Sequence, residues 1–242
     1  MQQSTFGTSR LVRQLDSWTP VETDGPGADV AERMSRWIDP LAAIRLQGAL
    51  QALRAAPPAA PPSRAAVTRA SKLAQDVQQT RAVLAKAVAQ DPLAGLGLAP
   101  GEDPGYAPWH QRHLELQRQM AQMVGAVRDH ARQTLAALSP RLRQLATLDA
   151  ILEDLLAARE PVLLSTTASL LERRHHQLRA AHRQVHETTG EPDDPAQWKR
   201  PGGWLHTFGA EWRQALLAEL DLRLEPVTGL VEALRNETGN LS

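Results

Sequence analysis

A regular run of leucines between residues 141 and 158 constrains the fold of this chain more than any other feature. Five leucines follow one another at steps of three or four residues, with charged residues and no Gly or Pro among them: Leu142, Leu145, Leu148, Leu152 and Leu155. This spacing places all five on one side of an α-helix. Because such an apolar stripe is unstable in water, the helix must pack against another helix.

The amino-acid composition also favours helices. Only one Tyr and two Phe accompany six Trp, although 42% of the 242 residues are hydrophobic. Ala and Leu must therefore supply most of the packing, which suits helices better than sheets. We predict an all-α fold, an elongated bundle of long amphipathic, coiled-coil-like helices joined by Gly/Pro-rich loops.

Cysteine content and charge exclude several classes of function. The chain has no Cys, which excludes disulfides, thiolate nucleophiles and cysteine metal sites. The 27 basic residues are balanced by 27 acidic ones, which argues against a dedicated nucleic-acid binder. We find neither a signal peptide nor an apolar run near the ~20 residues that span a bilayer. We therefore expect a cytoplasmic chain without direct membrane insertion.

Prolines divide the chain into an N-terminal part, a linker and a bundle. The sequence AAPPAAPPS at residues 55–63 cannot continue a helix and predicts a semi-rigid linker. Before it, in residues 1–54, we predict short helices at residues 11–15, 28–38 and 40–54. Asp39 is expected to cap the third of these helices and Pro40 to be its first residue. Residues 64–242 form the predicted helical bundle.

Within the bundle we predict six helices and two loops. The helices are expected at residues 64–90, 109–138, 141–158, 162–188, 204–224 and 226–236. Residues 91–108 and 189–203 are rich in Gly and Pro and are predicted loops, the first of which we expect to be disordered or to become ordered only on a partner. Ser139 and Pro140 are expected to cap the leucine-rich helix, and Pro161 to end or bend it.

A cationic stripe is predicted on helix 162–188. His175, Arg179, His182 and His186 recur at steps of four, three and four residues, which places them on one face. One interpretation is a surface that binds phosphates of duplex DNA. That surface would consist of Arg173, Arg174, Arg179, His182, Arg183 and His186. The simpler interpretation is a solvated outer face of a bundle helix.

The spacing of His182 and His186 can also place two imidazoles on one metal ion. However, the residues between them are Arg183, Gln184 and Val185, so the general base of an HExxH motif is missing and an arginine lies beside the site. We therefore expect neither a metal nor a cofactor. The sequence contains no Walker loop, Rossmann glycine run or Gly-x-Ser-x-Gly elbow, so we do not expect an enzyme.

Aromatic residues gather around the second loop. The group comprises Trp198, Trp204, Phe208 and Trp212. Such residues can stack on single-stranded bases, but Trp at helical spacing more often forms a hydrophobic anchor that closes a bundle or docks a partner. We favour the anchor and treat the four as candidate partner-binding residues. The nearby Asp193 and Asp194 precede a proline and are interpreted as turn residues.

Three segments of the chain resemble a known family. They are SRLVR at 9–13, LATLDA at 145–150 continuing to LAARE at 156–160, and LAELDLRLEPV at 217–227 followed by GLVEALR at 229–235. These blocks are similar to an uncharacterised, all-helical proteobacterial family encoded beside an OmpA/MotB-like membrane protein and a MotA-like coiled-coil protein. That gene set resembles the type III Zorya anti-phage system, whose ZorF-like accessory proteins the chain resembles.

The resemblance implies a non-enzymatic, cytoplasmic subunit of an anti-phage defence system. It implies assembly with a ZorG-like accessory protein, downstream of an inner-membrane motor of the ZorA/ZorB type, and engagement of double-stranded DNA as an additional role. Reasoning from the residues leaves two alternatives open: a DNA-binding module that uses the Arg/His face, and a generic coiled-coil scaffold. Association through leucine stripes should persist at high salt, whereas phosphate contacts should weaken steeply.

Overall fold

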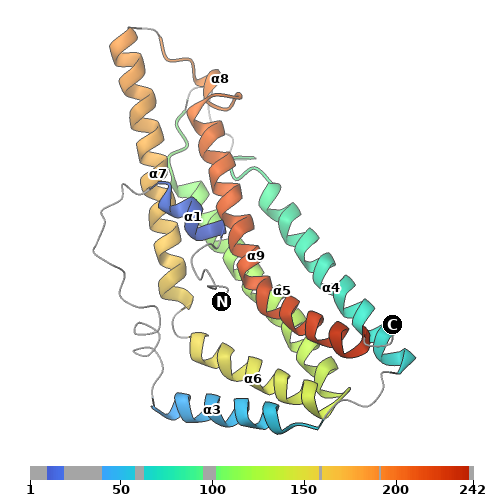
Figure 1. The fold of residues 1–242 in the computed structure, drawn as a ribbon. Coiled ribbons are helices and arrows are strands. Elements are labelled where there is room, and N and C mark those ends of the chain that lie inside the picture. The colour runs from blue at the N-terminus through green and yellow to red at the C-terminus, as the bar shows by residue number, and fades with distance from the viewer. Residues whose placement is uncertain are drawn as a thin grey trace, which may run out of the picture. The chain divides into compact units, whose positions relative to one another are not determined.

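A computed structural model describes residues 10–18, 40–57, 63–94, 102–157, 160–190 and 192–239. These residues form helices and contain no strand, which confirms the predicted all-α class (Figure 1). The helices are α1 (Arg10–Asp16), α3 (Pro40–Ala55), α4 (Arg64–Ala89), α5 (Ala107–Ala136), α6 (Pro140–Ala157), α7 (Glu160–Thr189), α8 (Pro195–Trp198) and α9 (Trp204–Gly239).

The chain divides into two compact units, and each unit combines segments that are distant in sequence. Unit 1 comprises residues 1–21, 83–121 and 163–222, and unit 2 comprises residues 22–82, 122–162 and 223–242. The division falls within α4, α5, α9 and the first turn of α7. The predicted boundary at residues 55–63 does not coincide with it, because α3 and most of α4, on either side of the linker, both belong to unit 2.

Most predicted helices are confirmed within one to three residues at each end. The proline-rich stretch interrupts the chain as expected, since α3 ends at Ala55 and α4 begins at Arg64. Pro40 is the first residue of α3, whereas its predicted cap Asp39 and the predicted helix at residues 28–38 lie outside the described residues. Pro161 is the second residue of α7, so the break that it predicts lies before that helix.

The cap between α5 and α6 is also confirmed. The Ser139 hydroxyl oxygen accepts a hydrogen bond of 3.1 Å from the backbone N–H of Leu142, and Pro140 is the first residue of α6. The cap satisfies one N–H donor that has no partner within the helix, and Pro140 contributes no donor at all. The chain can therefore reverse sharply from α5 into α6 without leaving that buried donor unpaired.

The structure corrects two predictions near the C-terminus. The loop at residues 189–203 contains the short helix α8, which begins at Pro195 with Asp194 as its N-cap. The predicted break between residues 224 and 226 is wrong, because α9 continues through Pro226. Proline removes one backbone hydrogen bond from a helix. Buried side chains on both sides, Leu224 and Val227, hold the helix in place despite that loss.

The loop at residues 91–108 is partly fixed by the chain itself. Tyr106 is buried, and its hydroxyl donates a hydrogen bond of 3.1 Å to the backbone carbonyl of Ala168 on α7. Leu93 is buried as well. These described ends of the loop thus pack within unit 1 and do not need a partner, contrary to our expectation. Residues 95–101 lie outside the described part of the chain.

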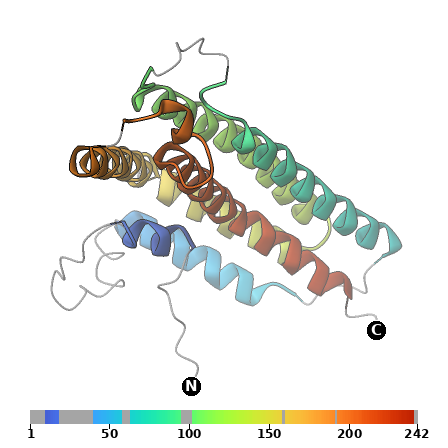
Figure 2. The same ribbon diagram turned by 90° about the horizontal axis from the view of Figure 1, so that it is seen from above.

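The long helices α4, α5 and α9 run alongside one another (Figure 2), and each buries a series of apolar side chains. The pattern on α4 is more regular than its large residues suggest, because two alanines belong to it. Its buried positions are Ala66, Ala70, Leu73, Val77, Leu84 and Val88. Their spacing of three, four or seven residues is that of one helix face. In unit 1, Arg112 on α5 also donates a hydrogen bond of 3.1 Å to the backbone carbonyl of Ala87 on α4.

In unit 2, α3 packs against α6, which carries the leucine stripe (Figure 1). The stripe is only partly covered: Leu142 and Leu148 are buried, whereas Leu152 is 39% exposed. On α3 the buried residues are alanines, Ala42 and Ala49, whereas the larger Leu41, Ile44 and Leu50 are exposed. Small residues allow the two helix backbones to approach closely, so this pair leaves large aliphatic side chains in water.

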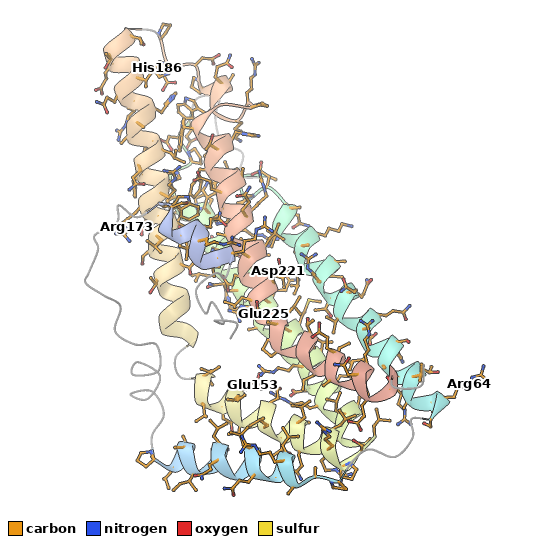
Figure 3. The ribbon with its side chains drawn as sticks, in the orientation of Figure 1. Arg64, Glu153, Arg173, His186, Asp221 and Glu225 are labelled. Carbon is orange, nitrogen blue, oxygen red and sulfur yellow. The ribbon has the colours of Figure 1, made fainter. Side chains whose placement is uncertain are left out.

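Two arginines of α5 and two acids of α6 form a charged network in unit 2. Arg128 binds Asp149 through two hydrogen bonds of 2.7 and 2.8 Å, and the Nε of Arg132 lies 2.7 Å from the same carboxylate. Glu153, labelled in Figure 3, lies 2.6 Å from Arg132. Burial of Asp149 raises its pKa, but the hydrogen bonds and charges of both arginines have the larger effect, so the pKa lies below its ordinary value.

This network escaped the sequence analysis, although its signal is visible. Both pairs, Arg128 with Arg132 and Asp149 with Glu153, are separated by four residues and so lie on one face of their helices.

Among the described residues, no helix is both long enough and apolar enough to cross a membrane.

We expect the Asp149→Ala variant to lose about 3–5 kcal/mol of its free energy of unfolding, because it leaves two half-buried guanidinium groups without their carboxylate. The matched control is Asp154→Ala on the same helix, whose pairing with Arg45 at 3.2 Å is exposed on both sides. That variant should lose less than about 1 kcal/mol. Urea denaturation followed by circular dichroism measures both changes, and equal losses would contradict the assigned role of Asp149.

Candidate functional site

The face of α7 that carries the cationic stripe turns inward in unit 1. It packs against α8 and the first turns of α9, so the two groups of candidate residues contact each other. The His175 ring centroid lies 4.9 Å from that of Phe208 and 5.3 Å from that of Trp204. The ring of His182 lies 6.1 Å from that of Trp198. The interpretation of the stripe as a solvated outer face is therefore wrong for His175, which is fully buried.

The aromatic group forms part of the core of unit 1. Phe208 and Trp212 on α9 are fully buried and meet Trp109 of α5 edge-on, at centroid distances of 5.0 and 5.3 Å. Trp204 is also buried, whereas Trp198 on α8 is half-buried. Three of the four predicted anchor residues thus join α9 to its neighbours within the chain. They are not on the surface, where a partner could dock.

His175 is a polar residue inside this apolar group. It has no exposed surface, and neither ring nitrogen has a hydrogen-bond partner among the described residues. Burial, and secondarily the neighbouring His176, lowers the pKa of His175 to about 4. Tyr106, at a ring distance of 5.5 Å, has a pKa raised by burial and by the nearby Glu172. His175 is thus neutral near pH 7 and acts as a packing residue.

Two arginines of the predicted phosphate-binding set are engaged within unit 1. Arg174 binds Glu211 of α9 through two hydrogen bonds of 2.8 and 2.7 Å, and this pairing raises the pKa of Arg174. Arg179 forms an ion pair with Asp103 from the loop at residues 91–108. In contrast, Arg173 and Arg183 are exposed, and Figure 3 shows Arg173 on the outer side of α7. Phosphate binding stays a prediction, because only Arg173 and Arg183 among the arginines of the predicted set are exposed.

The two remaining residues of the set, His182 and His186, meet the carboxylate of Asp193. His182 Nε2 lies 2.9 Å and His186 Nε2 lies 3.8 Å from Asp193 Oδ1. The same oxygen accepts a hydrogen bond of 2.7 Å from the indole N–H of Trp198. Slight burial raises the pKa of Asp193, but the hydrogen bonds from Trp198 and His182 lower it below its ordinary value. His186 marks this end of α7 in Figure 3.

Sequence reasoning missed the acids that complete this site. Asp103, Asp193 and Glu211 come from a loop, a second loop and α9, and each meets α7 only in the folded chain. Asp193 was interpreted as a turn residue together with Asp194. Only Asp194 has that role, because its carboxylate accepts a hydrogen bond of 3.0 Å from the N–H of Ala196. No local motif identifies the partner of Asp193.

The buried state of His175 predicts a pH-dependent stability. Its pKa in the folded chain, about 4, lies below the ordinary value of 6.5. Between these values the unfolded chain takes up a proton that the folded chain does not, so stability is lost as the pH falls through this window. Between pH 7 and pH 5, we expect the free energy of unfolding to fall by about 2 kcal/mol more in the native chain than in the His175→Leu variant.

Urea denaturation at both pH values measures this difference. His206 is exposed on α9 and provides the matched control. The His206→Leu variant should retain the pH dependence of the native chain. Identical pH dependence in the native chain and the His175→Leu variant would contradict the assignment.

Comparisons with known proteins identify the family but no activity. No curated protein and no solved structure matches the chain at a significant level. The profile of one family, described as a protein of unknown function (DUF3348), matches residues 1–236. This match covers all eight described helices up to the last turn of α9. The chain therefore belongs to the DUF3348 family.

Proposed function

We propose that this chain is a non-catalytic subunit that binds a helical partner protein through an exposed apolar surface of unit 2. The surface, here called the α3–α6 face, consists of Leu41, Ile44, Leu152 and Leu156. Their exposed fractions are 75%, 64%, 39% and 51%, respectively. These values carry the proposal, because large aliphatic side chains gathered in water are typical of interaction surfaces.

The four side chains lie at the same end of the helix pair. Arg45 of α3 and Asp154 of α6 approach to 3.2 Å, which shows the register of the two helices. Leu41 and Ile44 lie within one turn of Arg45, and Leu152 and Leu156 lie within one turn of Asp154. The helices run in opposite directions, so the start of α3 lies beside the end of α6 (Figure 1). We infer that one incoming surface contacts all four.

The shape of α3 favours a helix as the partner. Gly48 follows Leu41 and Ile44 on the same helix face, and a Cβ atom added at Gly48 would meet no atom within 4 Å. An approaching helix can thus come close at Gly48 while Leu41 and Ile44 insert into its surface. Complete burial of an aliphatic side chain contributes about 1.5–3 kcal/mol, so these half-exposed groups can form the centre of an interface.

The resemblance to ZorF-like proteins suggests the identity of the partner. A ZorG-like accessory protein is the first candidate, in a cytoplasmic anti-phage complex downstream of a ZorA/ZorB-like membrane motor. The proposal of an apolar interface does not depend on this identity, which rests on the resemblance alone. A coiled-coil scaffold would use the same kind of contact, and the two roles differ in whether the partner is another protein or a second copy.

We expect the double variant Leu41→Asp/Ile44→Asp to bind a co-expressed ZorG-like protein at least about tenfold more weakly than the native chain, since it places two charges in an apolar interface. Co-purification followed by titration calorimetry measures the change. The control is Val67→Asp, which alters an apolar side chain of unit 2 that is 42% exposed on α4. Unchanged affinity of the double variant would exclude the α3–α6 face.

Salt dependence separates partner binding from the alternative of DNA binding. Apolar association should persist between about 0.1 and 1 M salt, whereas phosphate contacts weaken steeply over this range. Mobility-shift assays with duplex DNA test the alternative directly. DNA binding through α7 would give a complex that weakens with salt and disappears when the exposed Arg173 and Arg183 are changed to Ala. We expect no such complex. Such a complex would favour the DNA-binding alternative.

A further inference from the structure

We propose that His182, His186 and Asp193 form a binding site for a divalent transition metal ion, and that Zn²⁺ suits it well. One atom from each residue, a ring nitrogen or a carboxylate oxygen, lies within 4.8 Å of the other two. Two imidazoles and one carboxylate are a donor set that zinc sites use, with further positions open to water. This site lies in unit 1 and is independent of the proposed function, whose surface belongs to unit 2.

The distances from Asp193 to the two histidines fit a metal ion with little rearrangement. Bonds of about 2.0–2.1 Å in a tetrahedral zinc site separate the ligand atoms by roughly 3.3 Å. Asp193 Oδ1 lies 2.9 Å from His182 Nε2 and 3.8 Å from His186 Nε2, so the observed values lie on either side of this separation. Each distance needs to change by about half an ångström for the ion to enter.

The carboxylate is held in place by contacts outside the cluster. Trp198 donates its indole N–H to Asp193 Oδ1 at 2.7 Å, and this kind of support is typical of metal ligands. The next residue, Asp194, caps α8, which fixes the backbone directly after the ligand. His182 and His186 are half-buried and Asp193 is exposed, so the cluster is ordered by packing yet reachable from solvent.

The electrostatic objection from sequence is weaker in the folded chain. Arg179, one turn before His182, is neutralised by its ion pair with Asp103. Arg183 is exposed, where solvent screens its charge. Asp193 supplies a negative charge directly at the site. These contacts remove most of the repulsion that a neighbouring arginine would otherwise exert on a cation.

The donor set also selects among ions. Imidazole nitrogens suit Zn²⁺, Cu²⁺ and Ni²⁺, whereas Mg²⁺ and Ca²⁺ prefer sites made of oxygen ligands. A bound ion would connect the last turns of α7 to the segment before α8, two segments that a hydrogen bond between His182 and Asp193 already joins. Binding should therefore stabilise the folded chain.

The test uses the full-length chain, freed of any histidine tag and of metal. After equilibrium dialysis against ZnCl₂, elemental analysis should find one zinc ion per chain, and Zn²⁺ should raise the Tm by at least about 3 °C. MgCl₂ should do neither. The Asp193→Asn variant retains the shape and hydrogen-bond acceptor of the carboxylate, and His186→Ala removes one ligand. Both should lose the bound zinc and the rise in Tm.

The matched control is His206→Ala, which removes an exposed histidine of α9 and should bind zinc as the native chain does. Circular dichroism of each variant without metal verifies that it is folded, and Asp193→Asn decides the outcome if His186→Ala does not fold. Absence of stoichiometric zinc in the native chain would overturn the proposal. Equal zinc content in the native chain and the Asp193→Asn variant would overturn it as well.

Discussion

Burial of the apolar seams on α4, α5 and α9 is the interaction on which the remaining structure depends. Leucines such as Leu84, Leu116, Leu220 and Leu234 are fully buried, and each contributes about 1.5–3 kcal/mol when it leaves water. The apolar faces of these long helices are thus covered within the chain. Helical stripes in general therefore do not require a partner protein. The aliphatic side chains that α3 and α6 leave exposed are the ones that support the proposal of a partner.

Charged residues are arranged around the seams as local pairs. In unit 2, Asp149 holds two arginines of α5, and in unit 1, Arg174 and Arg179 each have an acidic partner, Glu211 and Asp103, respectively. Two of the cations that resemble a phosphate-binding surface in the sequence, Arg174 and Arg179, are thereby engaged within the chain, whereas Arg173 and Arg183 are exposed. This arrangement agrees with the equal numbers of acidic and basic residues and with the absence of a net positive field.

The two surfaces that carry the proposals differ in their chemistry. The α3–α6 face in unit 2 is aliphatic and suits a helix of another protein. The cluster of His182, His186 and Asp193 in unit 1 is polar and suits a small cation. Membership of the DUF3348 family assigns no activity to either surface. Because the surfaces belong to different units and different interactions, a result for one does not decide the other.

Periodicity, proline and capping act over a few neighbouring residues, so the amino-acid sequence predicts most of the helices, the proline-rich interruption and the cap at Ser139. It also predicts that His182 and His186 share one helix face. In contrast, the burial of Ala42 in place of Leu41 and the position of Asp193 against the two histidines become visible only in the folded chain. Those outcomes depend on which distant segments pack together, and no local pattern in the chain encodes that choice.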